Sequence, residues 1–381
     1  MTTTTNATTK VTRTSIKQQL IDNQKLLDDS LDLNLQGCFI KIKSNSSPLL
    51  DKLSDYFENC HVLNKQQSGD SDKVDIVIIA IESKPLNLGV VFTDWAREPG
   101  KSGRKDEYFD FDEGRLVRKV RTGMVFLQSK IDLIAVGPCI ENDNQVINYI
   151  NSQYMNWLQN RGWLICHASG MSLEIDNANS KGFAIAGLSG GGKSTLMLEL
   201  METELVSYVT NDRLFIKKQQ HETEMLGIAK LPRINPGTIV GNPRLHGLLD
   251  PQQLENYQAM EKNELWHIEE KNDVPIIDIY GQHRLCYHTK LSIFIILNWR
   301  RDSQEETALT AINIKDREDA LAAIMKSPGP FYQHDNGQFQ TDDEEFDIAN
   351  YLSNLSDIEI YEATGLIDFK KMSELILVAL S

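Results

Sequence analysis

The stretch GFAIAGLSGGGKSTLMLELM, Gly182 to Met201, determines the fold class of this chain. Its first part, Phe183–Ala186, is a short apolar run that predicts a strand. After a glycine-rich segment, apolar residues recur with the spacing of one helix face, at Leu196, Met197, Leu200 and Met201. The order strand, glycine loop and helix is typical of an α/β domain, in which ligands bind beyond the carboxyl ends of strands.

The glycine-rich segment fits the pattern G-x-x-x-x-G-K-[ST] through Gly187, Gly192, Lys193 and Ser194. Glycines let the backbone turn its amide groups inward without Cβ clashes, so such a loop forms an anion nest at the helix N-terminus. Lys193 would neutralise the β- and γ-phosphates of a nucleotide, and the Ser194 hydroxyl would bind Mg²⁺. A flexible glycine turn that binds nothing is the alternative. The predicted nucleotide-binding residues are Gly187, Leu188, Ser189, Gly190, Gly191, Gly192, Lys193, Ser194 and Thr195.

A carboxylate follows the next predicted strand. The segment LVSYVTNDRL puts Asn211 and Asp212 at the carboxyl end of that strand, beside the glycine loop if the two strands are neighbours. A phosphoryl-transfer site needs acidic partners for Mg²⁺ and, in a kinase, a base for the acceptor hydroxyl. Asp212 is our predicted base and a predicted metal contact. The alternative is that Asn-Asp only turns the chain, which both residues do well.

These residues and several others resemble the HPr kinase/phosphorylase superfamily, and within it the branch called HPr kinase-related kinase B. The resemblance rests on the glycine loop, the Asn211-Asp212-Arg213 triplet after it and the His167 strand before it. Similarity to HPr kinase itself covers about Trp163 to Gly281, and similarity to the B branch runs from about residue 16 to the C-terminus. Further matching segments are KLPRINPGTIVGNPRL (Lys230 to Leu245), LWHIEEKNDVPIIDIYG (Leu265 to Gly281), LNWRR (Leu297 to Arg301) and KSPGPFY (Lys326 to Tyr332).

The resemblance implies a phosphoenolpyruvate-carboxykinase-like P-loop fold and ATP-dependent phosphorylation of a hydroxyl. By position, Lys193 matches the catalytic lysine and His167 the active-site histidine, while Asp212 matches the aspartate that accepts the proton. Glu270, eight residues before Asp278, has the spacing of the Mg²⁺-binding glutamate, although Glu269 could take that role instead. Asn211 replaces a family aspartate and removes a negative charge, so we assign no phosphorylase activity.

The chain divides by pattern into three parts. Residues 1–15 are Thr-rich and predicted to be a disordered tail, residues 16–160 an N-terminal α/β domain, and residues 161–381 the P-loop kinase domain. Helical spacing predicts a first helix over Ile16–Leu33, and a turn-rich connection is expected between the strand Trp163–His167 and the strand Phe183–Ala186. The fold class is therefore α/β, with a smaller N-terminal α/β domain.

Composition narrows the classes of partner and compartment. The 381 residues carry a net charge of −15, which disfavours nucleic acid as a partner. The five cysteines are scattered, as expected in a reducing compartment, and no apolar run approaches the ~20 residues that cross a bilayer. We expect a cytoplasmic protein without a membrane partner. The resemblance implies a homo-oligomer, with an ATP-grasp protein and an amphi-Trp protein as candidate partners.

Several basic residues have an open role. Arg300 and Arg301 end an apolar run and could neutralise a transferring phosphoryl group, or only mark a strand leaving the core. Arg233 and Arg244 lie in a Pro-rich loop that could close over substrate, or are simply solvated. A basic concentration in the N-terminal domain could dock an acidic partner or be a solvated hairpin face: Arg97, Lys101, Arg104, Lys105, Arg115, Arg118, Lys119 and Arg121.

Together these patterns predict a kinase that transfers the γ-phosphoryl group of ATP, with Mg²⁺, to a hydroxyl of a protein Ser or Thr or of a small molecule. In this hypothesis Ser194 and Glu270 bind the metal and Asp212 accepts the proton. Two other readings remain: an ATPase or GTPase switch with water as the acceptor, and a non-catalytic scaffold that senses nucleotide.

Overall fold

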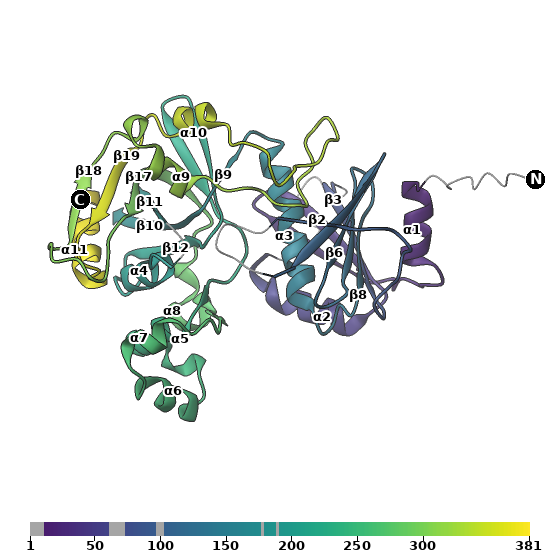
Figure 1. Cartoon of the computed structure of the whole chain (residues 1–381), viewed down its shortest axis with the longest axis horizontal. Helices are drawn as coiled ribbons and strands as arrows, with labels where there is room; N and C mark the ends of the chain where they lie inside the picture. The colour runs from purple at the N-terminus through teal and green to yellow at the C-terminus, as the bar shows by residue number, and fades with distance from the viewer. Residues whose placement is uncertain (1–10, 61–72, 97–102, 177–178, 188–189) are drawn as a thin grey trace, which may run out of the picture. The chain divides into compact units, whose positions relative to one another are not determined.

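A computed structural model describes residues 11–60, 73–96, 103–176, 179–187 and 190–381 (Figure 1). The chain forms two compact units. One unit is Met1–Arg161 together with Pro328–Glu345, and the other is Gly162–Ser327 together with Phe346–Ser381. The segment Pro328–Glu345, which we expected inside the kinase domain, therefore packs with the first unit. None of the described helices is both long and apolar enough to cross a bilayer.

The first unit is a mixed sheet covered by helices. In the described residues its strands lie in the order β1-β2-β3-β8-β7-β6-β5-β4, with β2, β3 and β8 parallel and the other neighbours antiparallel. Helix α1 packs against one face, and α3 packs against the other through Tyr149, whose ring meets that of Phe126. The elements are α1 (Arg13–Ile21), α2 (Ser47–Tyr56), α3 (Asp143–Gln159), β1 (Ser30–Leu35), β2 (Cys38–Ser44), β3 (Ile76–Glu82), β4 (Thr93–Asp94), β5 (Asp106–Phe111), β6 (Gly114–Lys119), β7 (Val125–Gln128) and β8 (Leu133–Gly137).

The first helix is shorter than the expected Ile16–Leu33 and starts earlier. Helix α1 begins at Arg13, inside the segment expected to be a tail, and ends at Ile21, before Asn23 adopts a left-handed φ of 59°. The second half of the expected helix is strand β1, in which leucines alternate with Asp32 and Asn34. Side chains here alternate between the two faces of a strand, with a period of two residues, because β1 pairs along its whole length with β2. Residues 1–10 of the expected tail lie outside the described residues.

The segment Pro328–Glu345 is held in the first unit by aromatic and polar contacts. The ring of Phe331 lies 5.4 Å from that of Phe126 and 5.1 Å from that of Tyr149. The buried guanidinium of Arg115 donates to the carbonyl oxygens of Pro330, at 3.1 Å, and Gln340, at 2.8 Å. These contacts satisfy a buried charge and close the aromatic core of this unit.

The second unit is built on a larger mixed sheet. Its strands lie in the order β12-β10-β11-β17-β14-β13-β9, and β19, itself paired with β18, adds to the second half of β17. The sheet strands are β9 (Leu164–Cys166), β10 (Ala168–Asp176), β11 (Asn179–Gly187), β12 (Val206–Thr210), β13 (Leu214–Gln219), β14 (Glu222–Leu226), β17 (His288–Leu297), β18 (Ala308–Ala311) and β19 (Glu359–Thr364), while β15 (Arg233–Ile234) pairs with β16 (Asn272–Asp273). The helices are α4 (Lys193–Leu200), α5 (Pro236–Gly241), α6 (Pro251–Gln258), α7 (Lys262–Trp266), α8 (Ile276–Tyr280), α9 (Glu318–Ile324), α10 (Ile348–Asn354) and α11 (Phe369–Leu380).

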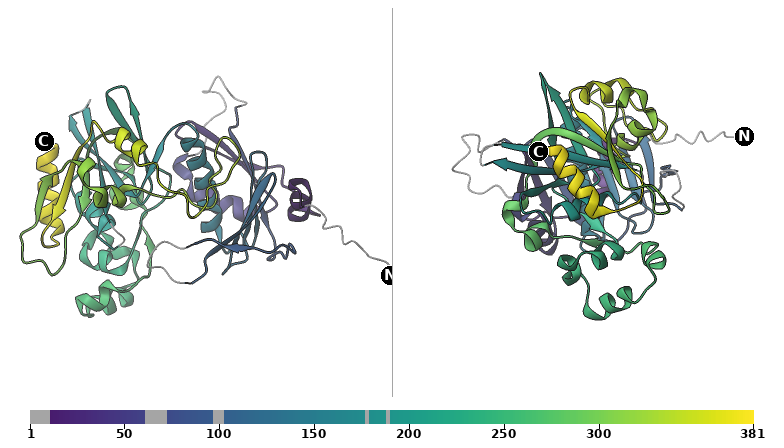
Figure 2. Two further views of the ribbon diagram at one scale, coloured as in Figure 1. Left: turned by 45° about the horizontal axis from the view of Figure 1, so that its top comes forward. Right: turned by 90° about the vertical axis from the view of Figure 1, so that its left-hand side faces the viewer.

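Alternate residues of β11 face two separate apolar cores. Phe183 and Ile185 pack with α4 and α11, which cover one face of the sheet. Ala184 and Ala186 pack on the other face with residues of α9 and α10. Figure 2 shows α11, in yellow, lying across the strands. The second unit is thus a three-layer α/β/α arrangement, which leaves the strand ends free to carry a site.

The expected turn-rich connection before Phe183 is instead strand β10. It runs antiparallel to β11 on one side and to β12 on the other, so it separates the two strands that carry the predicted site. Its small residues Ala168, Ser169 and Gly170, typical of turns, are buried here because the strand has a neighbour on each side. Since β11 and β12 are both antiparallel to β10, they are parallel to each other and end at the same edge, where β10 begins.

Candidate functional site

The glycine loop lies between strand β11 and helix α4, as the sequence predicts. Gly190 and Gly192 have left-handed φ angles of 82° and 88°, and Gly192 is the N-cap of α4. A Cβ on Gly192 would lie 2.8 Å from the ring of Phe369, so both conformation and space require glycine. The indole Nε1 of Trp299 donates to the carbonyl oxygen of Gly191 at 2.9 Å and supports the loop from behind. Leu188 and Ser189 lie outside the described residues.

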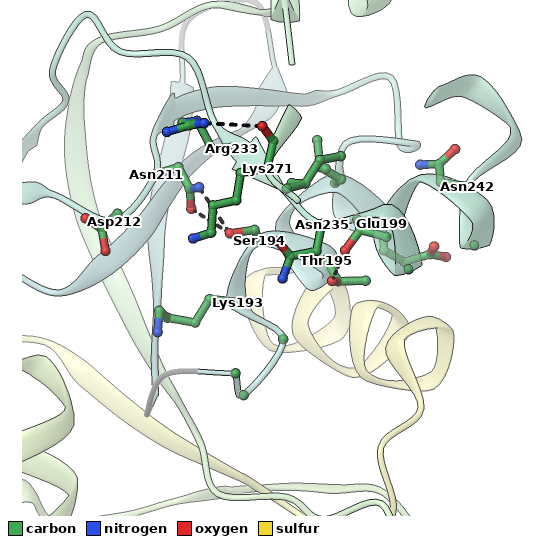
Figure 3. Close-up of a pocket in the computed structure, with 18 of the residues that line it drawn as sticks. Lys193, Ser194, Thr195, Glu199, Asn211, Asp212, Arg233, Asn235, Asn242 and Lys271 are labelled. Atoms are coloured by element: carbon green, nitrogen blue, oxygen red, sulfur yellow. Dashed lines mark hydrogen bonds between the residues drawn. The ribbon is translucent and has the colours of Figure 1, made fainter. Parts of the chain in front are cut away.

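The first residues of α4 connect the loop to the next strand. The Lys193 amino group donates to the carbonyl oxygen of Gly187 at 2.7 Å, across the mouth of the loop. The side-chain amide of Asn211 lies beside the Ser194 hydroxyl, with Asn211 Nδ2 at 3.1 Å from Ser194 Oγ (Figure 3). Asn211 also accepts a hydrogen bond from Ser169 Oγ at 2.7 Å. The segment after β12 is therefore fixed against the start of the helix, although β10 lies between the strands.

Asp212 adopts a strained backbone conformation and carries an accessible carboxylate. Its φ is 71°, which is uncommon for a residue other than glycine and typical of functional turns. The carboxylate Oδ1 lies 3.1 Å from His167 Nε2 and 3.5 Å from Lys326 Nζ, yet the side chain is 51% exposed. Desolvation acts to raise the pKa of Asp212, but the His167 hydrogen bond and the charges of Lys326 and Arg213 outweigh it and hold the pKa well below its usual value.

The loop, Asn211 and Asp212 line one cavity of about 480 Å³, a size typical of ligand pockets. The cavity is rich in cations although the chain is acidic. Five basic side chains, Lys193, Arg213, Lys230, Arg233 and Lys271, line it against two carboxylates, Glu199 and Asp212. Lys271 extends toward Asn211 and Ser194 (Figure 3). Such a concentration of positive charge at a helix N-terminus attracts an anion.

The amino group of Lys230 has a perturbed pKa. Desolvation and the nearby charge of Arg213 lower the pKa of its amino group to about 8. Arg233 adds repulsion, while Asp212 and Asp273 act in the opposite direction. The backbone of Lys230 is anchored above β12, because its carbonyl oxygen accepts a hydrogen bond from the Tyr208 hydroxyl at 2.9 Å.

The cavity has two chemically different ends. Asp212 and Arg233 lie at one end, and Asn242 and Glu199 lie at the other, with Ser194 and Thr195 between them (Figure 3). The far end holds the side-chain amide of Asn242 and the carboxylate of Glu199, whereas the first end carries a cation, Arg233. The hydroxyl of Thr195, between the two ends, lies 2.8 Å from that of Thr238. A ligand with a charged and a neutral part would therefore be oriented along the cavity.

The structure does not bring every predicted residue to this cavity. Of the described residues that line it, none is Glu270, Arg300 or Arg301. Glu270 is exposed and accepts a hydrogen bond from the Tyr257 hydroxyl at 2.7 Å, and Glu269 is exposed as well. Arg301 stacks on the ring of Trp266, and it is Trp266 that lines the cavity. Arg300 is exposed.

The two arginines of the Pro-rich loop, Arg233 and Arg244, lie in different environments. Arg233 lines the cavity, where it pairs with Asp273 at 3.1 Å and donates to the carbonyl oxygen of Lys271 at 3.2 Å. Arg244 instead pairs with Glu202 at 2.9 Å. Of these two arginines, only Arg233 is among the described residues that line the cavity.

Mg²⁺ can bind at this site only if hard oxygen donors lie near the glycine loop. The Ser194 hydroxyl and the amide oxygen of Asn211 are 3.2 Å apart and offer two such donors. In the described residues no three His, Cys, Asp or Glu side chains gather as a metal cluster. Mg²⁺ at a nucleotide usually takes one or two protein ligands and completes its shell with phosphates and water, so this donor set fits.

Sequence reasoning assigned no role to two residues of the site. Lys230 and Lys326 begin two of the matching segments, KLPRINPG and KSPGPFY, but their position next to Asp212 follows from the tertiary fold. The signal available was weak, because a single lysine at the start of a loop is common on any surface.

The basic concentration of the first unit is largely neutralised. Arg97 and Lys101 lie outside the described residues. Four of the others pair with carboxylates of β4 and β5: Arg104 with Asp94 and Glu107, Arg115 with Asp110, Arg118 with Glu107 and Lys119 with Asp106. Docking of an acidic partner there stays a prediction.

Comparison with protein-family models and with curated proteins gives no match. Among solved structures, the chain is similar to the Hpr(Ser) kinase/phosphatase from Coxiella burnetii, with 13% sequence identity and a TM-score of 0.27. The similarity covers 56% of this chain and 91% of that one. A TM-score this low does not establish a shared fold.

Proposed function

We propose that the cavity binds ATP and that the protein transfers its γ-phosphoryl group to a hydroxyl. One observation carries this proposal: the contact between Asn211 and Ser194, 3.1 Å long, holds Asp212 beside a glycine loop that begins a helix. An anion nest and an accessible carboxylate in one cavity are the two parts that phosphoryl transfer to a hydroxyl requires. The sequence resemblance to the HPr kinase-related proteins supports the same activity.

The loop would hold the triphosphate. Amide groups of the loop and the N-terminus of α4 face the anion, and Lys193, which now rests on the carbonyl of Gly187, would turn to the β- and γ-phosphates. Mg²⁺, held by Ser194 and Asn211, would neutralise the charge of the phosphates. The end of the cavity that carries Asn242 would take the nucleoside, which directs the γ-phosphate toward Asp212.

Asp212 would orient the acceptor and take its proton. The pKa of this carboxyl is held well below its usual value, so the group is ionised and accepts a hydrogen bond from an incoming hydroxyl. Oδ1 is engaged by His167 and Lys326, and Oδ2 lies 3.9 Å from Arg213. As the new O–P bond forms and the bond from the γ-phosphorus to the bridging oxygen breaks, the hydroxyl proton passes to Asp212 and ADP leaves. His167 acts here as a positioning residue.

Labelled ATP tests the activity directly. Purified protein is incubated with [γ-³²P]ATP, Mg²⁺ and fractions of extract from its host, and the labelled products are identified. We expect one labelled acceptor with wild type and with the surface control Asp357→Asn, none with Lys193→Met, and strongly reduced labelling with Asp212→Asn.

The same experiment distinguishes a kinase from the two other hypotheses, an ATPase switch and a non-catalytic scaffold. An ATPase switch releases labelled phosphate in amounts that match ATP consumption, with no labelled acceptor. A scaffold binds ATP without turnover. Either result would refute the kinase proposal.

A further inference from the structure

The end of the cavity around Asp212 holds more positive charge than a nucleotide site needs. Arg213, Lys230 and Arg233 all line this end, in addition to Lys193 in the loop. Within the described residues no carboxylate lies within 4 Å of the Lys230 amino group, whereas Arg233 has Asp273 at 3.1 Å. Lys230 is thus a desolvated cation without a close counter-ion.

Two of these cations belong to the β12 side of the site and not to the strand that leads into the glycine loop. Lys230 is anchored on Tyr208 of β12, and Arg213 directly follows Asp212. Strand β10 lies between β12 and β11, so the two strand axes are about 10 Å apart at the usual spacing of neighbouring strands. The loop amides and Lys193 serve the triphosphate on the β11 side, which leaves the β12 side for another anion.

We propose that the phosphoryl acceptor is a small hydroxy compound that itself carries a phosphate or carboxylate group, and that Lys230 and Arg233 bind this group while Asp212 faces the hydroxyl. The inference rests on the proposed kinase activity and names the substrate class of the same site. Four charged neighbours face Lys230: Arg213, Arg233, Asp212 and Asp273. The two carboxylates have other cationic partners, so a bound anion would supply the missing counter-charge.

The size of the cavity favours a small acceptor over a protein segment. The whole space is about 480 Å³ and must also hold the nucleotide. Lys230 is partly buried where it lines the cavity. A compact anion fits the space that remains beside Asp212, and its hydroxyl can be only a few bonds from the charged group.

Three matched probes test the inference. Protein saturated with a non-hydrolysable ATP analogue and Mg²⁺ is titrated in a calorimeter with glycerol 3-phosphate, with glycerate and with glycerol, which differ in the anionic group. We expect at least one anion to bind and glycerol to bind at least tenfold more weakly. Lys230→Gln should weaken anion binding about tenfold, as expected for a lost charged hydrogen bond. Lys230→Arg should retain it, and the surface control Lys290→Gln should bind like wild type.

The readouts separate this inference from the proposed function. If wild type does not bind the ATP analogue, the proposed function fails. If it binds the analogue but neither anion, or binds glycerol as well as glycerol 3-phosphate, the anionic acceptor is refuted. Unchanged anion affinity in Lys230→Gln, or binding of an acidic Ser-containing peptide in place of both anions, overturns it as well.

Discussion

Asp212 combines three properties that a structural turn does not need. It has a left-handed φ of 71°, its carboxylate meets His167 at 3.1 Å, and half of its side chain is exposed to the cavity. Backbone strain of this kind costs about 1–3 kcal/mol and persists where function requires the geometry. The residue therefore marks the reacting end of the site.

Replacing Asp212 by Asn should separate binding from transfer. The amide keeps the size of the side chain but accepts no proton, so we expect ATP affinity within about threefold of wild type and transfer reduced by roughly 10²–10⁴-fold. Equilibrium binding and labelled-product formation, measured on the same preparation, check both parts. Transfer at the wild-type rate would show that Asp212 is not the base.

The pKa of Lys230 leads us to expect that acceptor binding weakens at high pH. Its pKa of about 8 lies below the usual lysine value, so the positive charge is lost as the pH rises through about 8. The KM for an anionic acceptor should therefore rise above pH 8, with little change in the KM for ATP. Lys230→Arg, which stays charged, should keep the acceptor KM flat to about pH 10. An acceptor KM that rises equally in both proteins would contradict this assignment.

The turn from strand β11 to helix α4 requires glycine at position 192. A Cβ on Gly192 would lie 2.8 Å and 2.9 Å from two ring carbons of Phe369, and its φ of 88° is unfavourable for any other residue. Gly192→Ala should lower the free energy of unfolding by about 1–3 kcal/mol and weaken ATP binding. Thermal unfolding and nucleotide titration measure both effects.

A second variant separates the two causes. Phe369→Ala in the Gly192→Ala background removes the ring but leaves the backbone strain, so part of the ATP affinity should return. Gly192→Ala with wild-type ATP affinity would mean that this turn does not shape the nucleotide site.

At the level of elements, the sequence predicted the parts that follow a local period. The strand β11, the glycine loop, the helix α4 and the strand β12 lie where Gly182–Thr210 places them. The predictions for two segments were wrong, each for a physical reason. Strand β1 was read as helix because its leucines fit both periods, and β10 was read as turns because its small residues favour turns unless neighbouring strands cover them.

The site was predictable only where its residues are near each other in sequence. Ser194 and Asn211 belong to one strand-helix-strand unit, and the sequence places Asn211 beside the loop only if the two strands are neighbours. Strand β10 lies between those strands, and the contact forms nonetheless. Lys326 reaches Asp212 from 114 positions away in the chain, and no local rule places it there. The metal role of Glu270 was carried over by spacing alone, and the structure instead directs its carboxylate to Tyr257.

At the scale of the whole molecule, the first unit is completed by a segment from the C-terminal part of the chain. Phe331 is buried against Phe126 and Tyr149, and Asn156 of α3 donates to its carbonyl oxygen at 2.7 Å. Phe331→Ala should cost about 3–5 kcal/mol of unfolding free energy, the usual range for a buried aromatic residue.

Hydrogen exchange shows which unit loses stability in Phe331→Ala. We expect faster exchange in β7 and α3 of the first unit, and unchanged protection in β11 and β17 of the second. The exposed Phe346, 41% accessible and assigned to the second unit, provides the control substitution, for which little change is expected. Loss of protection in β11 with none in β7 would show that residues 328–345 belong with the second unit.

The net charge of −15 and the cationic cavity also belong to the whole molecule. Negative charge is spread over the chain, while five basic side chains converge on one sheet edge. Composition alone therefore could not reveal an anion site, since the fold decides where the basic residues meet.

A crystal structure with a non-hydrolysable ATP analogue and Mg²⁺ is the most direct test of the central claim. We expect the triphosphate to lie in the glycine loop, with Lys193 Nζ within hydrogen-bond distance of the γ-phosphate and that phosphate facing Asp212. A nucleotide bound elsewhere, or bound in the reverse direction with its base beside Asp212, would contradict the account.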